Sequence, residues 1–328
     1  MSNWQYKQGL HDLGHGAYAY LQPDGSWGWS NAGLVTSGGE ALLVDTLFDL
    51  KLTQRMLDAM RAATPAATRI GTLVNTHANG DHCYGNQLLA GATIIASRTG
   101  AAEMDELPPA VMAAMMKQAR AAGPVGEFIA RCFGAFDFEG IVHTPPNRTF
   151  DGELALTVGD KEVRLIEVGP AHTKGDVLVH VPADRVVFTG DILFIEGTPI
   201  MWAGPVGNWI RACDLILAMD VDVIVPGHGP ITDRTGVQAV RDYLVHIHEE
   251  SRQRYDAGMT ATEAARDIAL GAYASWRDAE RIVVNVHTIY RELSGGKLAS
   301  PGPVQLFGLM AELARGQQRG ATAPSPTG

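Results

Sequence analysis

Short hydrophobic runs alternate with turn-forming residues along much of the first third of the chain. Five such runs, bounded by Gly, Asp or Pro, predict β-strands at residues 16–21, 31–37, 41–46, 70–75 and 93–97. Leu52, Met56 and Met60 recur at helical spacing within residues 49–63 and predict one amphipathic helix. A shorter helix is expected at 84–89. This part of the chain therefore mixes strands with helices.

Residues 98–148 have a different composition, rich in Ala and Met, and predict a helical insertion. The methionines Met104, Met112, Met115 and Met116 have two interpretations. They can be core residues of a helical hairpin, or the adaptable apolar inner face of a lid over a pocket. The two interpretations are compatible.

The second half of the chain repeats the strand pattern and then becomes helical. Strands are predicted at 154–158, 163–168, 177–181, 186–189 and 221–225. Helices are predicted at 208–218, from Arg234 onward and at 282–293, and Thr260 with Glu263 forms a capping box. The Gly-, Gln- and Pro-containing tail at 316–328 is expected to be disordered.

Composition and charge argue against nucleic-acid-binding, disulfide-rich and membrane proteins. The 328 residues include 26 Lys and Arg against 36 Asp and Glu, which gives a net charge of −10 and argues against a nucleic-acid partner. An apolar content of 46% supplies a buried core. Three cysteines, Cys83, Cys132 and Cys213, are too few for a disulfide framework. With no signal-peptide pattern and no long apolar run, we expect a cytoplasmic protein without a membrane partner.

Histidine and aspartate gather in loops that directly follow predicted strands. His77, Asn79, Asp81 and His82 come after the strand at 70–75. Three later strands are followed by loops that contain His172 and Asp176, then Asp191, then His228. Imidazole and carboxylate groups are the ligands expected for zinc, and they also suit iron or manganese. The recurrence of this context predicts a metal site.

The segment His77-Ala78-Asn79-Gly80-Asp81-His82, followed in order by His172, Asp191 and His228, resembles the metallo-β-lactamase superfamily. The first motif of that family is His-x-His-x-Asp-His, and Asp45 in Leu-Val-Asp-Thr resembles its supporting aspartate. The pattern by itself predicts only a strand-rich α/β fold. The resemblance implies an α/β fold of the αβ/βα type, a four-layer sandwich of two mixed sheets between helices. The metals then lie at one sheet edge.

The resemblance also implies a division of the chain and a ligand set. Residues 1–235 are expected to form the metallo-β-lactamase-like domain, interrupted by the helical insertion at about 98–148, and residues 236–315 a helical C-terminal extension. One metal is expected on His77 and His172, the other on Asp81, His82 and His228, with Asp191 bridging. Asp45 and Asp176 are expected to support these ligands.

Asn79 departs from the family motif, because it stands where the second histidine is usual. An amide oxygen is a poorer zinc ligand than imidazole. We therefore expect one or two Zn²⁺ ions per chain, with the first site weak, empty or occupied by iron or manganese.

A metal-activated water that attacks an ester, thioester or lactone is the predicted chemistry, with Asp81 as the catalytic residue that orients the nucleophile or moves its proton. Met201 and Trp202 follow Asp191 and predict a small, partly apolar substrate, although Trp202 can equally be a packing residue. Altered ligation at Asn79 keeps a second hypothesis open, namely a cyclase, decarboxylase or iron-dependent oxygenase. A non-catalytic metal-binding protein is the third.

The predicted partner is a small-molecule substrate. The helical C-terminus resembles the extra helices with which family hydrolases shape a pocket or a dimer interface, so a homodimer remains open. We expect negligible hydrolysis of β-lactam antibiotics, because this chain lacks an export signal and carries an extra helical insertion.

Overall fold

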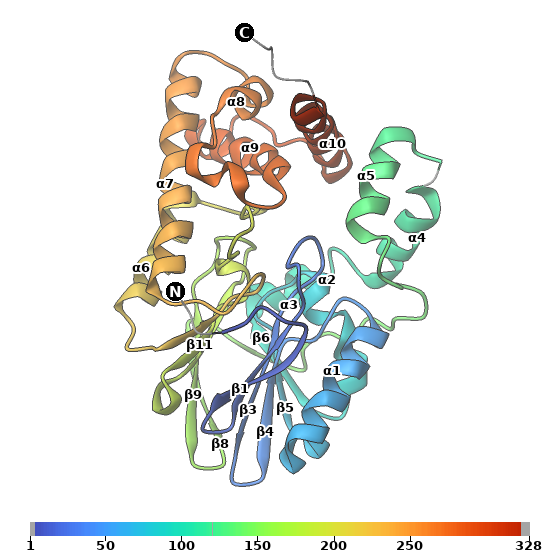
Figure 1. The fold of residues 1–328 in the computed structure, drawn as a ribbon, viewed down its shortest axis with the longest axis vertical. Coiled ribbons are helices and arrows are strands. Elements are labelled where there is room, and N and C mark those ends of the chain that lie inside the picture. Colours follow the sequence, from blue (N-terminus) through green and yellow to red (C-terminus); the bar gives the residue numbers. More distant parts are fainter. Residues whose placement is uncertain (1–3, 120, 323–328) are drawn as a thin grey trace.

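The computed structural model describes residues 4–119 and 121–322 and contains two β-sheets packed face to face (Figure 1). The larger sheet is formed by seven strands in chain order: β1 (Gly9–Gly14), β2 (Ala17–Leu21), β3 (Ala32–Ser37), β4 (Glu40–Val44), β5 (Thr72–Val74), β6 (Thr93–Ser97) and β7 (Arg148–Phe150). The first four strands pair antiparallel, whereas β4 to β7 pair parallel. This mixed pairing brings the carboxyl ends of β4, β5 and β6 to one edge of the sheet.

The smaller sheet has five strands: β8 (Glu153–Val158), β9 (Lys161–Glu167), β10 (Val177–Val181), β11 (Val186–Phe188) and β12 (Val223–Val225). Its pairs are antiparallel except for β11 and β12, which run parallel. The inner faces of both sheets contribute to one apolar cluster that includes Leu42, Val74, Val179 and Phe188. This buried layer holds the two sheets together.

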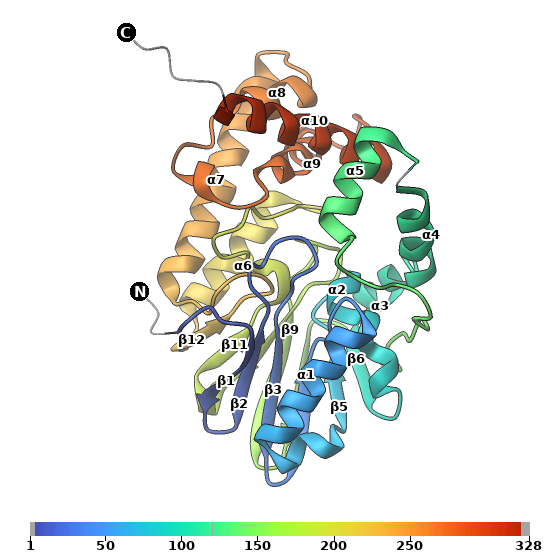
Figure 2. The same ribbon diagram turned by 45° about the vertical axis from the view of Figure 1, so that its right-hand side comes forward.

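Helices cover the outer faces of both sheets, and Figures 1 and 2 show them on opposite sides of the molecule. Helix α1 (Leu50–Ala63) lies beside the larger sheet, and Leu52, Met56 and Met60 of the predicted apolar stripe are among its buried residues. Its first turn is capped by the Asp49 carboxylate, which accepts from the Leu52 N–H. Helices α6 (Val206–Ala218) and α7 (Arg234–Asp256) lie beside the smaller sheet. The result is the predicted αβ/βα sandwich.

The insertion and the C-terminal extension form further helices above the sheet edge. The insertion contains α3 (Arg98–Met104), α4 (Pro109–Ala119) and α5 (Gly123–Phe133). The extension begins within α7 and continues with α8 (Ala261–Asp267), α9 (Ile282–Leu293) and α10 (Pro303–Thr322). Figure 2 shows α5 beside α10, and the Phe307 ring on α10 lies 5.9 Å from the Phe133 ring on α5. We call α5 and α10 the helical roof.

Several expectations are confirmed in detail, and others need correction. The Thr260–Glu263 capping box is present at the start of α8. The short helix expected at 84–89 is a 3₁₀ helix that follows the four-residue helix α2 (Gly80–Cys83). Strands β1 and β7 were not expected, because β1 lacks a clear alternating pattern and β7 has only three residues.

The tail prediction is also corrected. Helix α10 continues to Thr322, and residues 323–328 lie outside the described part of the chain. The helix begins before the predicted tail, and its buried residues Leu306, Met310 and Ala314 repeat at helical spacing and pack into the main core, which gives this first part of α10 an apolar face. Among the helices that the structure describes, none is long and apolar enough to cross a membrane.

Candidate metal centre

The predicted ligands come from segments that follow strands of both sheets, and Asp81 and His82 among them lie in the short helix α2. His77, Asp81 and His82 follow β5, and His172 lies between β9 and β10. Asp191 lies in a 3₁₀ turn (Gly190–Ile192) after β11, and His228 follows β12. The parallel pairing of β11 with β12 brings Asp191 close to His228. The structure thus gathers residues that are up to 151 positions apart between His77 and His228.

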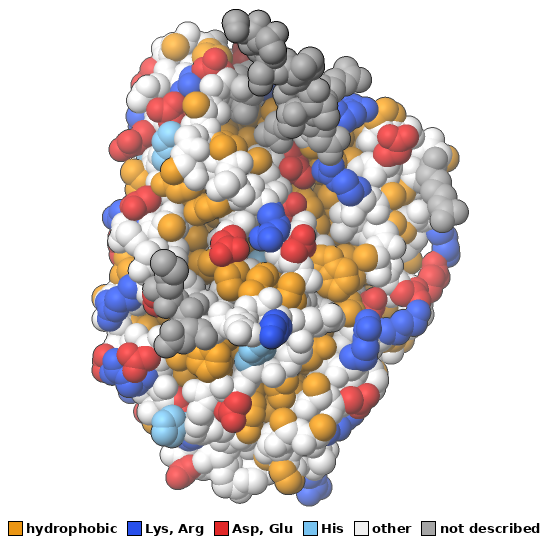
Figure 3. Space-filling view, viewed as in Figure 1, with side chains coloured by type: hydrophobic (Ala, Val, Ile, Leu, Met, Phe, Trp, Pro, Cys, Tyr) orange, Lys and Arg blue, Asp and Glu red, His pale blue; other side chains and the backbone are white. Residues whose placement is uncertain are grey.

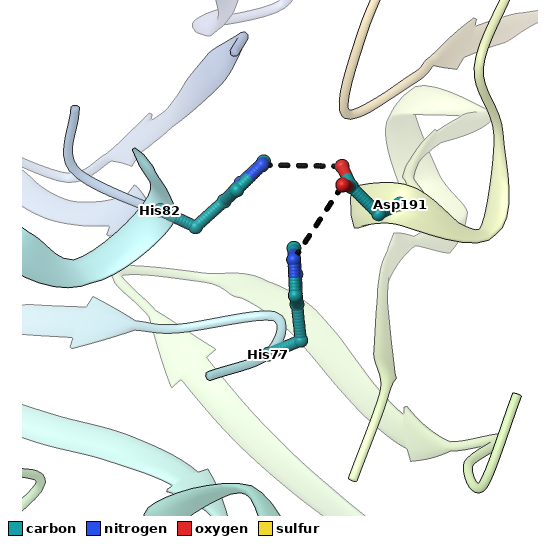
Figure 4. Close-up of side chains that lie close together, drawn as sticks. All are labelled: His77, His82 and Asp191. Atoms are coloured by element: carbon teal, nitrogen blue, oxygen red, sulfur yellow. Dashed lines mark ion pairs between the residues drawn. The ribbon is translucent and has the colours of Figure 1, made fainter. Parts of the chain in front are cut away.

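All four of these histidines face the carboxylate of Asp191. Oδ1 of Asp191 lies 3.1 Å from Nε2 of His82. Oδ2 lies 3.3 Å from Nε2 of His172, 3.5 Å from Nε2 of His228 and 3.6 Å from Nε2 of His77. Figure 4 shows His77 and His82 both directed at Asp191. Space for the carboxylate depends on Gly227, because a Cβ there would lie 2.0 Å from Oδ1 of Asp191.

Asp81 completes a second group of donor atoms. Its Oδ2 lies 3.2 Å from Nε2 of His228 and 4.0 Å from Nε2 of His82. Two sets of side chains have donor atoms close enough together to share one ion: His77, His82 and Asp191, and Asp81, His82 and His228. His82 belongs to both sets and Asp191 to the first, so the bridging role expected for Asp191 stays a prediction.

The outer nitrogen of each histidine is held by a neighbour. Nδ1 of His82 lies 2.9 Å from Oδ2 of Asp45, and Nδ1 of His77 lies 3.0 Å from the Thr76 hydroxyl oxygen. The remaining two, His172 and His228, donate from Nδ1 to the carbonyl oxygens of Ile200 (2.6 Å) and Gly25 (3.1 Å). Such outer contacts fix the direction of each ring and leave Nε2 free for a metal.

Asp45 lies at the end of β4 with a left-handed backbone, φ +62°. Its Oδ1 accepts from the Thr76 backbone N–H and its Oδ2 from the Thr76 hydroxyl, both at 2.7 Å. Asp tolerates this backbone conformation better than most residues. Asp45 therefore contacts both His82 and Thr76, the residue that precedes His77.

The chemistry of the donor set fits a divalent transition metal. His77 Nε2, His82 Nε2 and Asp191 Oδ1 are buried, and none has a hydrogen-bond partner among the described residues. Buried polar atoms without partners are unfavourable unless an ion or water satisfies them. Imidazole nitrogen and carboxylate oxygen suit Zn²⁺, and also iron or manganese.

Electrostatics divide the histidines into two pairs. Burial lowers the pKa values of His77 and His172, which keeps both rings neutral. Burial also acts against protonation of His82 and His228, but Asp191 and the other nearby carboxylates raise the pKa of His82 well above its usual range and that of His228 to about 9. Burial would raise the pKa of Asp191, yet the facing imidazoles hold it well below its usual range. Asp191 is thus a carboxylate at neutral pH.

Asn79, the departure from the family motif, lies at the same centre. Its side-chain oxygen lies 2.7 Å from Nε2 of His172. The residue is half-buried, unlike the four fully buried histidines. Asn79 therefore faces the expected first metal position from the more open side.

The other predicted residues lie around this cluster. Asp176 is buried and accepts from the Thr173 N–H and hydroxyl, directly after His172. Burial raises its pKa to about 8. Trp202 is half-buried and donates its backbone N–H to the His172 carbonyl oxygen at 2.9 Å, whereas the Met201 side chain is fully buried. Their substrate contact stays a prediction.

Cys83 follows His82 but has the surroundings of a core residue. It is buried, its Sγ lies 3.6 Å from the Ala78 carbonyl oxygen, and burial raises the pKa of its thiol well above the usual range. The thiolate that nucleophilic chemistry requires is therefore disfavoured.

Sequence reasoning missed several residues that position the ligands. Thr76 precedes His77 and could have been noticed from its place in the motif. The carbonyl groups of Gly25 and Ile200 have no signature in sequence, because every residue carries a carbonyl. Phe194 was also missed, although its ring stacks on that of His228 with an interplanar angle of 4°.

A family comparison agrees with this geometry. The description of the matching family is metallo-beta-lactamase superfamily, and its model matches residues 25–228, well over half of the chain. The chain belongs to the metallo-beta-lactamase superfamily. The resemblance drawn from the motifs is therefore confirmed, and the matched region includes every predicted metal ligand from His77 to His228.

Superfamily relatives match shorter stretches. A linear primary-alkylsulfatase from a Pseudomonas species is 26% identical over 139 residues, which is 38% of this chain and 26% of that protein. The alpha subunit of a 2,4-dinitroanisole O-demethylase from a Nocardioides species is 31% identical over 90 residues, 26% of each chain. The chain thus spans about a quarter of the length of either relative.

Among solved structures, the sec-alkylsulfatase Pisa1 from a Pseudomonas species is similar with a TM-score of 0.64 and 17% identity. The similarity covers 91% of this chain and 52% of that one, and at this identity it shows the fold alone. The fold is that of the metallo-hydrolases of this superfamily, and the alkylsulfatase relatives agree with the reaction class expected from the motifs.

Proposed function

We propose that this chain is a metal-dependent hydrolase that cleaves an ester, thioester or lactone of a small, partly apolar substrate. The observation that carries the proposal is the convergence of four histidine Nε2 atoms on the Asp191 carboxylate. Family membership and the relative named as an alkylsulfatase support hydrolysis as the reaction class.

The metal set in this proposal is one or two Zn²⁺ ions per chain. His82, Asp81 and His228 would hold one ion, His77 and His172 the other, and Asp191 would contact both. When bound, the metal lowers the pKa of a water molecule and polarises the scissile carbonyl group. The held Nδ1 atoms orient the four rings before the substrate arrives.

Asp81 is the residue that we assign to proton transfer. Its side chain is 13% exposed, whereas those of the four histidines and Asp191 are at most 4% exposed. Burial raises its pKa, but the hydrogen bond with His228 and the charge of His82 outweigh this effect, so the pKa lies below its usual value. Asp81 is then a carboxylate that can accept a proton from the attacking nucleophile at Oδ1 or Oδ2.

The substrate in this proposal carries an apolar or aromatic group. The Trp202 ring lies 6.5 Å from that of Phe307 on the helical roof, and the Phe307 ring lies 5.7 Å from that of Trp27. Trp202 and Phe307 are both half-buried, so their rings retain surface that a ligand can cover. The Trp202 backbone N–H donates to the carbonyl oxygen of the predicted ligand His172, which supports a role for this aromatic surface in substrate binding.

The test is hydrolysis of a matched substrate set by metal-free and zinc-reconstituted protein. Phenyl acetate, its thioester analogue and an aryl lactone supply the three bond types, and an alkyl sulfate supplies a charged comparison. We expect turnover of at least one uncharged substrate that is lost with chelator and restored by metal. Asp81→Asn should lower kcat by about 10²–10⁴-fold.

The matched control is Asp151→Asn, an exposed aspartate whose side chain is 65% exposed and pairs with Arg98. This variant should retain wild-type turnover. Hydrolysis that survives complete metal removal, or that Asp81→Asn leaves intact, would contradict the proposed role of the centre.

A second reaction is favoured by one comparison. The O-demethylase subunit is named for its action on 2,4-dinitroanisole, an aromatic methyl ether. We therefore include 2,4-dinitroanisole among the substrates, with dinitrophenol release as the readout. If this ether is turned over in preference to the esters, the bond that is cleaved is an ether and not an ester. The proposal of an aromatic group in the substrate is then retained.

The surface and the cysteines of the protein bear on its partners and its subcellular localisation. Acidic and basic side chains are interspersed on the face shown in Figure 3, with apolar groups between them, which supports a small-molecule substrate over nucleic acid. Cys83, Cys132 and Cys213 are free and buried, which suits a reducing compartment, and we place the protein in the cytoplasm.

A further inference from the structure

Side chains on one face of α9 make a series of hydrogen bonds to the backbone of the loop at 198–206. The residues involved are Arg281, directly before the first residue of α9, and Asn285, Thr288, Arg291 and Glu292 within it, and they recur at helical spacing. In chain order they contact the backbone of Thr198, Pro199, Met201, Ala203 and Val206. The C-terminal extension therefore determines the path of a loop that belongs to the metal-binding domain.

Asn285 is at the centre of this series and holds the chain on both sides of Ile200. Its amide N–H donates to the Pro199 carbonyl oxygen at 2.9 Å, and its amide oxygen accepts from the Met201 N–H at 2.7 Å. The side chain of Asn285 is completely buried. Two hydrogen bonds from one buried amide fix the peptide groups that flank Ile200.

The carbonyl group of Ile200 lies between those two fixed positions and contacts a predicted metal ligand. It accepts from Nδ1 of His172 at 2.6 Å. Because a carbonyl oxygen can only accept, Nδ1 must carry the proton, and Nε2 is left with the lone pair that a metal needs. The direction of the Ile200 carbonyl thus selects the tautomer of His172.

We infer that Asn285 is a positioning residue for His172: by clamping Pro199 and Met201 it aims the Ile200 carbonyl, which holds His172 with Nε2 toward the metal centre. The inference rests on the proposed function only in treating His172 as a metal ligand. It assigns the C-terminal extension a part in the metal site, in addition to its part in the helical roof.

The first test is the tautomer of His172 in metal-free protein, measured by nitrogen-15 NMR on histidine-labelled samples and assigned with His172→Gln. The wild-type ring should be a single Nδ1–H tautomer with a slowly exchanging proton. Asn285→Leu removes both clamping hydrogen bonds and should give a tautomer mixture or a rapidly exchanging proton.

Metal affinity is the second readout. Outer partners of metal-binding histidines typically contribute 10–100-fold to affinity. Asn285 acts one contact further out, so we expect Asn285→Leu to raise the Kd of the ion held by His172 about tenfold, in chelator competition with Zn²⁺. The Kd of the ion held by Asp81, His82 and His228 should not change.

Tyr243→Phe is the matched control. The Tyr243 hydroxyl accepts a hydrogen bond from the same Asn285 Nδ2 at 3.0 Å, and Tyr243 belongs to α7 and not to the loop. The variant removes a buried hydrogen bond of the same residue, lowers Tm, and should leave the His172 tautomer and both Kd values unchanged. A loss of stability is thereby separated from a loss of positioning.

Thr288→Val is the second variant if Asn285→Leu does not fold. The Thr288 hydroxyl donates to the Met201 carbonyl oxygen at 2.8 Å, and valine keeps its shape. Faster exchange of the His172 Nδ1 proton supports the inference. A wild-type Nε2–H tautomer, or variants with a lower Tm but an unchanged tautomer, would overturn it. Absence of bound metal in the wild type would instead refute the proposed function, and the tautomer test would stand.

Discussion

The side-chain oxygen of Asn79 lies 2.7 Å from Nε2 of His172. Nδ1 of His172 donates to the Ile200 carbonyl, so Nε2 carries a lone pair and cannot donate to the amide oxygen. Two arrangements make this contact favourable: a cation contacts both atoms, or the Asn79 amide is turned so that its NH₂ group donates. In the second arrangement Asn79 competes with a metal for His172.

Asn79→His should therefore strengthen the first metal site. Imidazole restores the family motif and is a better zinc ligand than an amide oxygen. We expect zinc bound to protein purified without added metal to rise toward two ions per chain, measured by elemental mass spectrometry. Unchanged stoichiometry in this variant would show that Asn79 does not limit the site.

Asp191→Ala should remove the group shared by both expected metal positions. Its carboxylate lies within 3.6 Å of all four histidine Nε2 atoms, so neither ion keeps its ligand set. We expect bound metal to fall below one ion per chain in elemental analysis. Asp151→Ala, at an exposed position, is the control and should keep the wild-type content. Full metal content in Asp191→Ala would disprove the bridging assignment.

Metal binding should release protons and strengthen as pH rises. The raised pKa values of His82 and His228 mean that both rings are protonated at pH 7 without metal, and both must lose the proton to bind an ion. We expect about two protons released per chain at pH 7, counted by calorimetry in buffers of different ionisation enthalpy. Affinity for the ion at His228 should increase with pH up to about 9, its folded-state pKa, and level off above it. A heat of binding independent of the buffer would contradict this.

Asp176 should make the metal-free protein less stable as pH rises. Burial raises its folded-state pKa to about 8, so the folded form keeps a proton that the unfolded form loses near pH 4. The free energy of unfolding that protonated Asp176 contributes is fully present below the unfolded-state pKa. It declines by about 1.4 kcal/mol per pH unit until the pH passes the folded-state pKa. Asp176→Asn should flatten this decline between pH 5 and 8 in urea unfolding. Parallel pH profiles for the variant and wild type would show that Asp176 is ionised in the folded state.

The proximity of the predicted ligands was easier to infer from the sequence than the contacts that orient their rings. His77, Asp81 and His82 share one loop, and the strand that precedes it has a clear apolar pattern, so their proximity could be inferred. The contact that orients His172 comes from the Ile200 carbonyl, and the residues on either side of Ile200 are bonded by Asn285, which lies 85 positions beyond Ile200 in the chain. Such a contact leaves no local pattern, since each residue alone looks like an ordinary core position.

Strand β7 and the full length of helix α10 were not predicted, because both elements depend on contacts between segments that are distant in the sequence. Strand β7 has three residues and exists because Arg148–Phe150 pairs with the end of β6. Helix α10 contains Gly308 and Gly316, residues of low helix propensity, and its packing against α5 compensates for them. Tertiary contacts decided both elements. By contrast, the apolar stripe of α1 and the Thr260–Glu263 cap were readable because both depend on neighbours within one helix.

The helical roof has two origins in the chain. Helix α5 interrupts the region that the family shares, residues 25–228, whereas α10 lies 75 positions beyond its end. The groups that face Asp191 all lie inside the shared region and are contributed by loops at strand ends. The two helices of the roof therefore belong to other segments of the chain than the groups that face Asp191, so substitutions in the roof leave every one of those groups in place.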